Sequence, residues 1–182
     1  VKASGVSNVN LTDNGGNDLR TLNVEATGKT TIAVVSNNLS KVDAAASTAS
    51  VIVDATARAG ALTFTGGSGD DRIDVSNAAF ITTTSAFAGG NGTDIVALNS
   101  SFDTATAAQL TAVNKLSGVE QFTVRGGGNT ATINAGLVTS VGKFGFENTG
   151  AIALTNVTNG NSFVVNGVVN AAGTNVAMKT GQ

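Results

Sequence analysis

Two stretches of the chain repeat one nine-residue pattern of glycines, an acid and an apolar residue. Residues 66–74 read GGSGDDRID and residues 89–97 read GGNGTDIVA, so both fit the form G-G-x-G-x-D-x-U-x, in which U is apolar. Glycine tolerates positive φ and has no side chain to block a cation, so the first half of the pattern predicts a turn that can point several backbone carbonyls at one centre. The apolar position predicts the start of a short inward-facing strand. The pattern therefore predicts the stacked turns and strands of a parallel β-roll.

Turns of this kind suit a calcium ion, which takes about six to eight oxygen ligands at roughly 2.3–2.6 Å from carboxylates and backbone carbonyls. Stacked strands lie about 4.8 Å apart, so an ion fits between two successive turns, each of which supplies an aspartate. We therefore pair Asp71 with Asp94 as carboxylate ligands of Ca²⁺. The alternative is that both stretches are ordinary turns, because Gly-Asp and Asn-Gly dipeptides are common in turns. Two complete matches favour the calcium interpretation.

The two motifs begin 23 positions apart, at Gly66 and Gly89. The segment between them, residues 75–87, must then hold the opposite turn of a coil and a return strand. We expect one coil with an enlarged far turn.

Composition and charge fit stacked strands better than a helical bundle. The chain has 182 residues, of which 12% are charged, and it contains 23 Gly but no Pro, Cys, Trp, Tyr or His. The ten Lys and Arg residues are scattered singly and the net charge is −2, so no basic patch predicts binding to nucleic acid. No apolar run approaches the roughly 20 residues of a membrane span, and no signal peptide is recognisable. Because the chain starts at Val1, we interpret it as a segment of a longer protein.

Pairs of apolar residues at alternate positions recur at short, regular intervals and predict one solenoid domain over residues 1–182. With two strands in each coil, the expected period is roughly 20 residues. Antiparallel hairpins in a β-sandwich would give similar spacing, but the calcium motif and the Asn-rich turns favour parallel stacking. The pairs are Leu22/Val24, Ile32/Val34, Val51/Val53, Leu62/Phe64, Ile73/Val75, Phe122/Val124, Ala131/Ile133, Phe144/Phe146, Ile152/Leu154 and Phe163/Val165. The predicted fold class is all-β, a parallel β-solenoid with one short helical insertion.

The helical insertion is predicted near residues 103–116, where apolar residues recur at helical spacing. Asp103 or Thr104 is the expected N-cap and Gly118 the C-terminal glycine. We interpret the helix as a cover for the solenoid core.

Two further glycine turns, at residues 15–18 and 126–131, look like eroded copies of the motif. The first has its acid at the wrong offset, and the second has Ala131 where the ligand aspartate should be. One sandwiched ion is therefore expected. A second ion would need Asp13, Asp18, Asp74 or solvent as additional ligands.

The chain resembles the RTX repeat proteins that Gram-negative bacteria secrete through type I systems, and more narrowly their calcium-dependent surface-layer proteins. The resemblance rests on the stretches LTFTGGSGDD at 62–71, DIVAL at 94–98 and LSGVEQFTV at 116–124. It implies an extracellular, cell-surface protein whose subunits fold and interlock into a lattice when calcium is present. It also implies a ligand set of two carboxylates, Asp71 and Asp94, completed by backbone carbonyls of Gly66, Ser68, Asp70, Gly89, Asn91 and Thr93.

Two other function classes remain open from the sequence. One is an adhesin or a module that binds cell-surface polysaccharide, although the exposed Trp and Tyr residues usual on sugar-binding faces are absent. The other is a polysaccharide-active enzyme. Without His or Tyr the chain cannot form a Ser-His-Asp site, and Glu25, Glu120 and Glu147 look isolated in the sequence. We therefore expect a structural protein rather than an enzyme.

Overall fold

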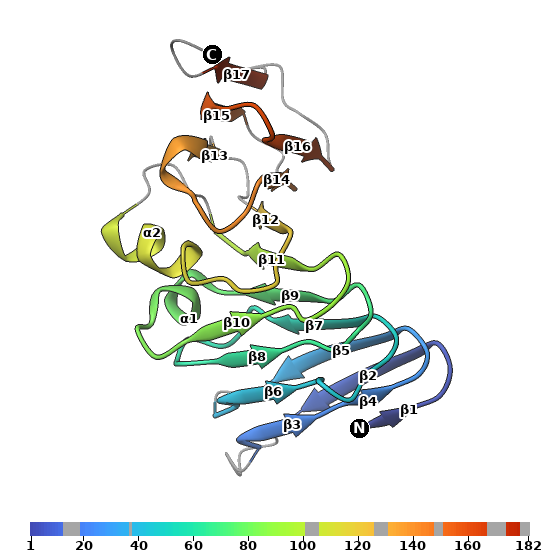
Figure 1. Ribbon diagram of the computed structural model, residues 1–182. Helices are drawn as coiled ribbons and strands as arrows, with labels where there is room; N and C mark the ends of the chain where they lie inside the picture. The colour runs from blue at the N-terminus through green and yellow to red at the C-terminus, as the bar shows by residue number, and fades with distance from the viewer. Residues whose placement is uncertain are drawn as a thin grey trace.

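In the computed structural model the chain winds into a parallel β-solenoid of about six turns (Figure 1). The structure describes residues 1–12, 19–36, 38–100, 106–125, 131–147, 151–166 and 174–178. Every pairing between its named strands is parallel. The parallel solenoid predicted from the sequence is confirmed, and the β-sandwich alternative is excluded.

One long sheet runs along the solenoid and shorter sheets form its other sides. The long sheet has eight strands, in the order β16-β14-β12-β11-β9-β7-β5-β2. Its strands are β2 (Ser7–Thr12), β5 (Thr30–Val35), β7 (Val51–Ala55), β9 (Arg72–Val75), β11 (Ile95–Leu98), β12 (Gln121–Val124), β14 (Lys143–Phe146) and β16 (Ser162–Val165). The four-stranded sheet contains β3 (Thr21–Asn23), β6 (Lys41–Asp43), β8 (Thr63–Thr65) and β10 (Ala86–Ala88). The remaining strands are β1 (Lys2–Ala3), β4 (Glu25–Ala26), β13 (Ala131–Asn134), β15 (Ile152–Val157) and β17 (Thr174–Met178).

The length of a coil varies along the solenoid. In the long sheet, Lys143 pairs with Ser162 across a short coil, whereas Ile95 pairs with Gln121 across a longer one. The two glycine motifs keep their sequence offset in the pairing of Ile73 with Val96. The period of roughly 20 residues expected from the sequence is therefore only an average, because the far turns differ in length.

The core is a column of inward-facing side chains in register from coil to coil. In the long sheet Ile32, Val53, Ile73, Val96, Phe122 and Phe144 follow one another on successive strands, and all are buried. The apolar pairs predicted from the sequence are buried wherever the structure describes both side chains, with one exception. Phe163 is 45% exposed because β16 is the edge strand of the sheet, so no further described coil covers it.

Two short α-helices lie beside the coils, where the sequence predicts one. Helix α2 (Ala107–Val113) has Thr106 as its N-cap, with a capping box to Gln109, and ends at Asn114. It is thus shorter than predicted, and the expected caps Asp103 and Thr104 lie outside the described residues. Gly118 has a positive φ of 54°, but it lies beyond the helix and not at its C-terminus.

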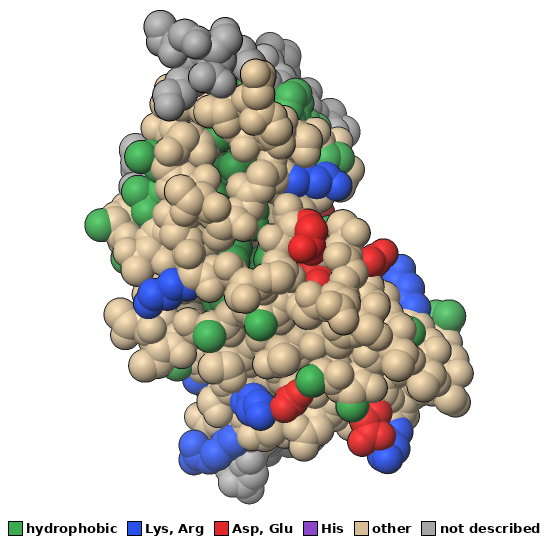
Figure 2. Space-filling view, viewed as in Figure 1, with side chains coloured by type: hydrophobic (Ala, Val, Ile, Leu, Met, Phe, Trp, Pro, Cys, Tyr) green, Lys and Arg blue, Asp and Glu red, His purple; other side chains and the backbone are tan. Residues whose placement is uncertain are grey.

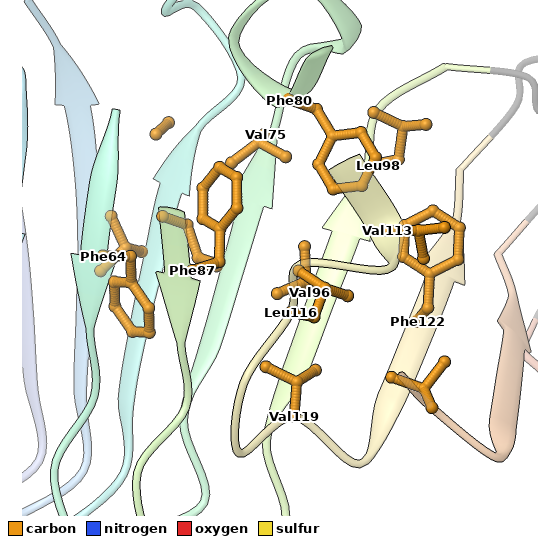
Figure 3. Close-up of a cluster of buried hydrophobic side chains, with 14 of the residues drawn as sticks. Phe64, Val75, Phe80, Phe87, Val96, Leu98, Val113, Leu116, Val119 and Phe122 are labelled. Atoms are coloured by element: carbon orange, nitrogen blue, oxygen red, sulfur yellow. The ribbon is translucent and has the colours of Figure 1, made fainter. Parts of the chain in front are cut away.

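The unpredicted helix, α1 (Asn77–Ile81), occupies the enlarged far turn between the two motifs. Phe80 on this helix stacks against Phe87 and Phe122, with ring centroids 5.9 and 5.5 Å apart (Figure 3). Gln109 of α2 donates a hydrogen bond from Nε2 to Asn77 Oδ1 and so links the two helices. A short 3₁₀-helix, η1 (Ala135–Leu137), follows β13.

Candidate functional site

The two glycine motifs form stacked turns on one edge of the solenoid. Residues 66–71 join β8 to β9, and residues 89–94 join β10 to β11. The strands on both sides are in register, Thr65 with Ala88 and Arg72 with Ile95, so the two turns lie against each other. A third turn, residues 117–120, follows in the next coil, where Ser117 forms a parallel bridge with Ala88.

Glycine is required in these turns because the backbones approach each other closely. A Cβ on Gly66 would overlap the carbonyl oxygen of Gly89, and a Cβ on Gly89 would overlap that of Gly118. Gly90 and Gly92 have φ values of 106° and 127°, which side-chain-bearing residues rarely adopt. The glycine half of each motif thus allows the close stacking of successive turns.

Three carboxylates form a ladder along this edge, each binding a backbone amide of the preceding coil. Asp71 Oδ1 accepts from the Val51 amide, Asp94 Oδ1 from the Asp71 amide, and Glu120 Oε2 from the Asp94 amide, each at 2.7 Å. Asp71 and Asp94, which the sequence pairs as ligands, are therefore neighbours. Glu120 was missed because its turn lacks the glycine pattern. It directly precedes β12 as Asp94 directly precedes β11, and an acid in that place is the signal that could have found it.

The second oxygens of the two buried aspartates differ. Asp71 Oδ2 accepts from the Gly67 amide at 2.6 Å. Asp94 Oδ2 is buried and has no hydrogen-bond partner among the described residues, although Asp94 is only 1% exposed. A buried oxygen of this kind normally has a donor or a cation, so Asp94 Oδ2 marks a place where a ligand would fit.

The electrostatics of the turns also favour a cation. The pKa of Asp94 is raised to about 6, mainly by burial and also by the nearby carboxylates of Asp71, Glu120 and Asp70, against the lowering effect of the hydrogen bond from the Asp71 amide. Burial likewise raises the pKa of Asp71. A bound cation would remove this repulsion.

The backbone carbonyls named as ligands are not used by the fold. The six oxygens of Gly66, Ser68, Asp70, Gly89, Asn91 and Thr93 accept no hydrogen bond within the described parts of the chain. Neighbouring carbonyls do accept hydrogen bonds: the Gly67 carbonyl accepts from the Asn91 amide, and the Asp71 carbonyl accepts from the Ile95 amide. The side chain of Asp70 accepts from the Thr93 amide at 2.8 Å and links the two turns.

No three acidic, His or Cys side chains come together in a metal-binding group among the described residues. A cation in the stacked turns would thus depend on two or fewer carboxylates at once, with backbone carbonyls and water as its other ligands. Calcium accepts such a mixed oxygen shell, because it does not demand a rigid octahedron.

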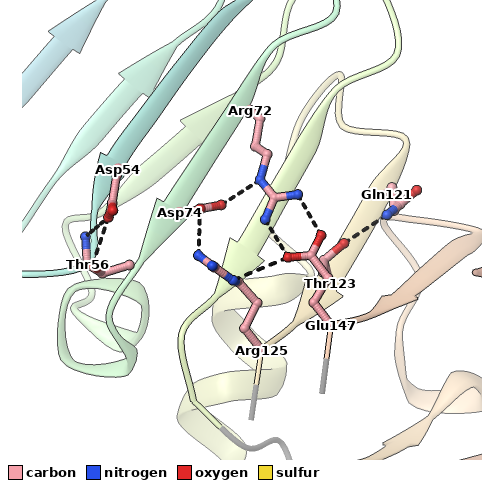
Figure 4. A network of polar contacts seen from close by, with 8 residues as sticks. All are labelled: Asp54, Thr56, Arg72, Asp74, Gln121, Thr123, Arg125 and Glu147. Atoms are coloured by element: carbon pink, nitrogen blue, oxygen red, sulfur yellow. Dashed lines mark hydrogen bonds and ion pairs between the residues drawn. The ribbon is translucent and has the colours of Figure 1, made fainter. Parts of the chain in front are cut away.

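Of the other acids considered as extra ligands, the structure describes only Asp74. Asp13, Asp18 and both eroded glycine turns fall outside the described residues, apart from the backbone of Ala131. Asp74 is within the described part but lies on β9, where it binds the guanidinium groups of Arg72 and Arg125 at 2.7 Å (Figure 4). The suggestion that Asp74 assists a second ion is therefore wrong, because two arginines already neutralise its carboxylate.

Glu147 completes a four-membered charge network on the outer face of the long sheet. Both of its oxygens accept hydrogen bonds from Arg72, at 2.7 and 2.8 Å, and Arg125 Nε lies 3.2 Å from Oε2 (Figure 4). The network joins β9 to the ends of β12 and β14. Glu147, which looks isolated in the sequence, is thus paired, and Glu25 also pairs with Lys2 at 2.7 Å.

An apolar pocket of about 220 Å³ lies between the two helices. Phe80, Phe87 and Leu116 contribute to its wall, and Lys115 is the one ionisable side chain among its described lining residues. On the face drawn in Figure 2, the Lys and Arg side chains lie in small separate groups on a mainly uncharged surface.

None of the described helices combines the length and apolar character needed to cross a membrane. No protein-family model, curated protein or solved structure matches the chain. We therefore infer the function from the geometry of the stacked turns.

Proposed function

We propose that this chain is a calcium-binding structural module of a bacterial surface-layer protein, secreted to the cell surface and stabilised by Ca²⁺. The observation that carries the calcium part is the buried, unpartnered Oδ2 of Asp94 in a turn stacked directly on that of Asp71. The unused carbonyl oxygens of both turns support it. We assign the chain no catalytic role.

The surface-layer part of the proposal is supported by the sequence resemblance alone. In that role the solenoid would be a rigid building block that associates with further copies of itself in a calcium-dependent lattice. Parallel coils linked through ions between their turns suit a load-bearing coat, because each ion joins segments that belong to different coils.

The test is thermal unfolding in calcium and in EGTA for the wild type and Asp94→Asn. At a free concentration of about a hundred times Kd, calcium should stabilise the wild type by about 2.7 kcal/mol, or by roughly 5–10 °C in Tm. Asp94→Asn should lose most of that shift, because a neutral amide replaces one of the two carboxylate ligands. Glu25→Gln, at an exposed surface pair, is the matched control and should keep the shift. Equal melting of the wild type in both solutions would refute calcium binding.

Assembly is tested separately by electron microscopy of the same samples. Ordered sheets that form in calcium and disperse in EGTA would support the surface-layer role. A monomer that binds calcium and stays dispersed would leave the calcium site intact but contradict the lattice role, and would favour an adhesin.

A further inference from the structure

The unpartnered oxygen of Asp94 lies next to the backbone of the third turn. A Cβ built on Gly89 would lie 2.5 Å from Asp94 Oδ2 and would overlap the carbonyl oxygen of Gly118. Two acceptor oxygens from consecutive coils thus converge on one place, and no donor among the described residues serves either of them. Oxygens that face each other in this way repel unless a positive charge lies between them.

Glu120 brings a further carboxylate to this place. Its Oε2 accepts from the Asp94 amide at 2.7 Å, whereas its Oε1 has no hydrogen bond to the described part of the chain. Glu120 therefore holds in the third turn the position that Asp94 holds in the second. The longer glutamate side chain reaches the Asp94 amide although the third turn lacks the GGxGxD pattern.

We propose that Asp94, Glu120 and the carbonyl oxygen of Gly118 form a second calcium site, between the second and third turns. Carboxylate and carbonyl oxygens are hard ligands, and the exposed position of Glu120 leaves room for the waters that complete a calcium shell. The inference rests on the proposed function, because Asp94 is common to both sites. Three stacked turns would then hold two ions in a row, with Asp94 between them.

The arrangement predicts a specific pattern of lost sites in calorimetric calcium titrations of the full chain. The wild type should bind two ions. Asp71→Asn and Glu120→Gln should each lose one, and Asp94→Asn should lose both or bind at least tenfold more weakly. Glu25→Gln should match the wild type. A Glu120→Gln isotherm identical to that of the wild type would overturn the second site alone, whereas no binding by the wild type would overturn both proposals.

Thermal unfolding distinguishes a Glu120 that binds calcium from a Glu120 that only supports the fold. Glutamine keeps an oxygen that can accept from the Asp94 amide, so Glu120→Gln should melt like the wild type in EGTA. In calcium, its rise in Tm should be smaller than that of the wild type. If the Tm of Glu120→Gln is lowered by the same amount in EGTA and in calcium, Glu120 only binds the Asp94 amide and the second site is refuted.

Discussion

At the edge formed by the stacked turns, single carboxylates link each coil to the preceding one. Asp71, Asp94 and Glu120 each satisfy a backbone amide of the preceding coil, which offsets part of the cost of burying charge at this edge. The motif predicts the two aspartates because their spacing to the glycines is fixed. It does not predict Glu120, since only the register of the folded coils brings that residue to the same edge.

The Glu147 carboxylate gives a prediction about pH. Its hydrogen bonds from Arg72 lower its pKa, despite the opposing effect of burial, whereas burial raises the pKa of Asp74 in the same network. A lowered folded pKa means that the stabilisation by Glu147 is complete above its ordinary pKa of about 4.3 and is lost as the pH falls through the lower folded value. The contribution of Glu147 to stability should therefore fall on acidification below about pH 4.3.

Replacing Glu147 by glutamine should remove that contribution. We expect Glu147→Gln to lower the free energy of unfolding at pH 7 by about 1–3 kcal/mol, and to show a shallower loss between about pH 4.5 and 3. Urea unfolding across that range measures both effects. Glu25→Gln, at the exposed pair with Lys2, should not differ measurably from the wild type at any pH. Parallel acid profiles for Glu147→Gln and the wild type would show that the ion pair is not coupled to folding.

Among the secondary-structure elements, the strands could be predicted from the sequence, but the helices could be predicted only in part. The alternating apolar pairs predict strands because each places two side chains on the same face, and the structure buries these pairs in the core. Helix α1 was missed because five residues make little more than one turn, too few to establish a 3.6-residue period. Helix α2 was found, but its boundaries depend on the Thr106–Gln109 capping box, which the apolar spacing does not reveal.

Helix α1 should nevertheless contribute strongly to stability through Phe80. This ring is 1% exposed and contacts both Phe87 and Phe122. Phe80→Ala should cost about 3–5 kcal/mol, because the cavity between the helix and the sheet cannot close fully. Phe163→Ala, at the exposed edge strand, should cost less than about 1 kcal/mol. Urea denaturation of both variants tests this, and equal losses would show that α1 is not packed as part of the core.

For the whole molecule, the sequence predicts a parallel solenoid but not its local variations. The glycine motif carries that prediction, because its two halves correspond to a turn and an inward strand. The enlarged far turn between the motifs was expected from their 23-residue spacing. The lengths of the other coils could not be read from the sequence, since they depend on what each far turn holds. The charge network of Arg72, Asp74, Arg125 and Glu147 is equally invisible in the sequence, because its members meet only when the strands stack.

A crystal structure grown with calcium, with anomalous diffraction data collected for Ca²⁺, would locate any ion in the stacked turns. We predict anomalous peaks within about 2.3–2.6 Å of carboxylate oxygens, one between the turns of Asp71 and Asp94 and one between those of Asp94 and Glu120. A map with no anomalous peak near Asp94, in crystals grown at saturating calcium, would contradict calcium binding by the stacked turns.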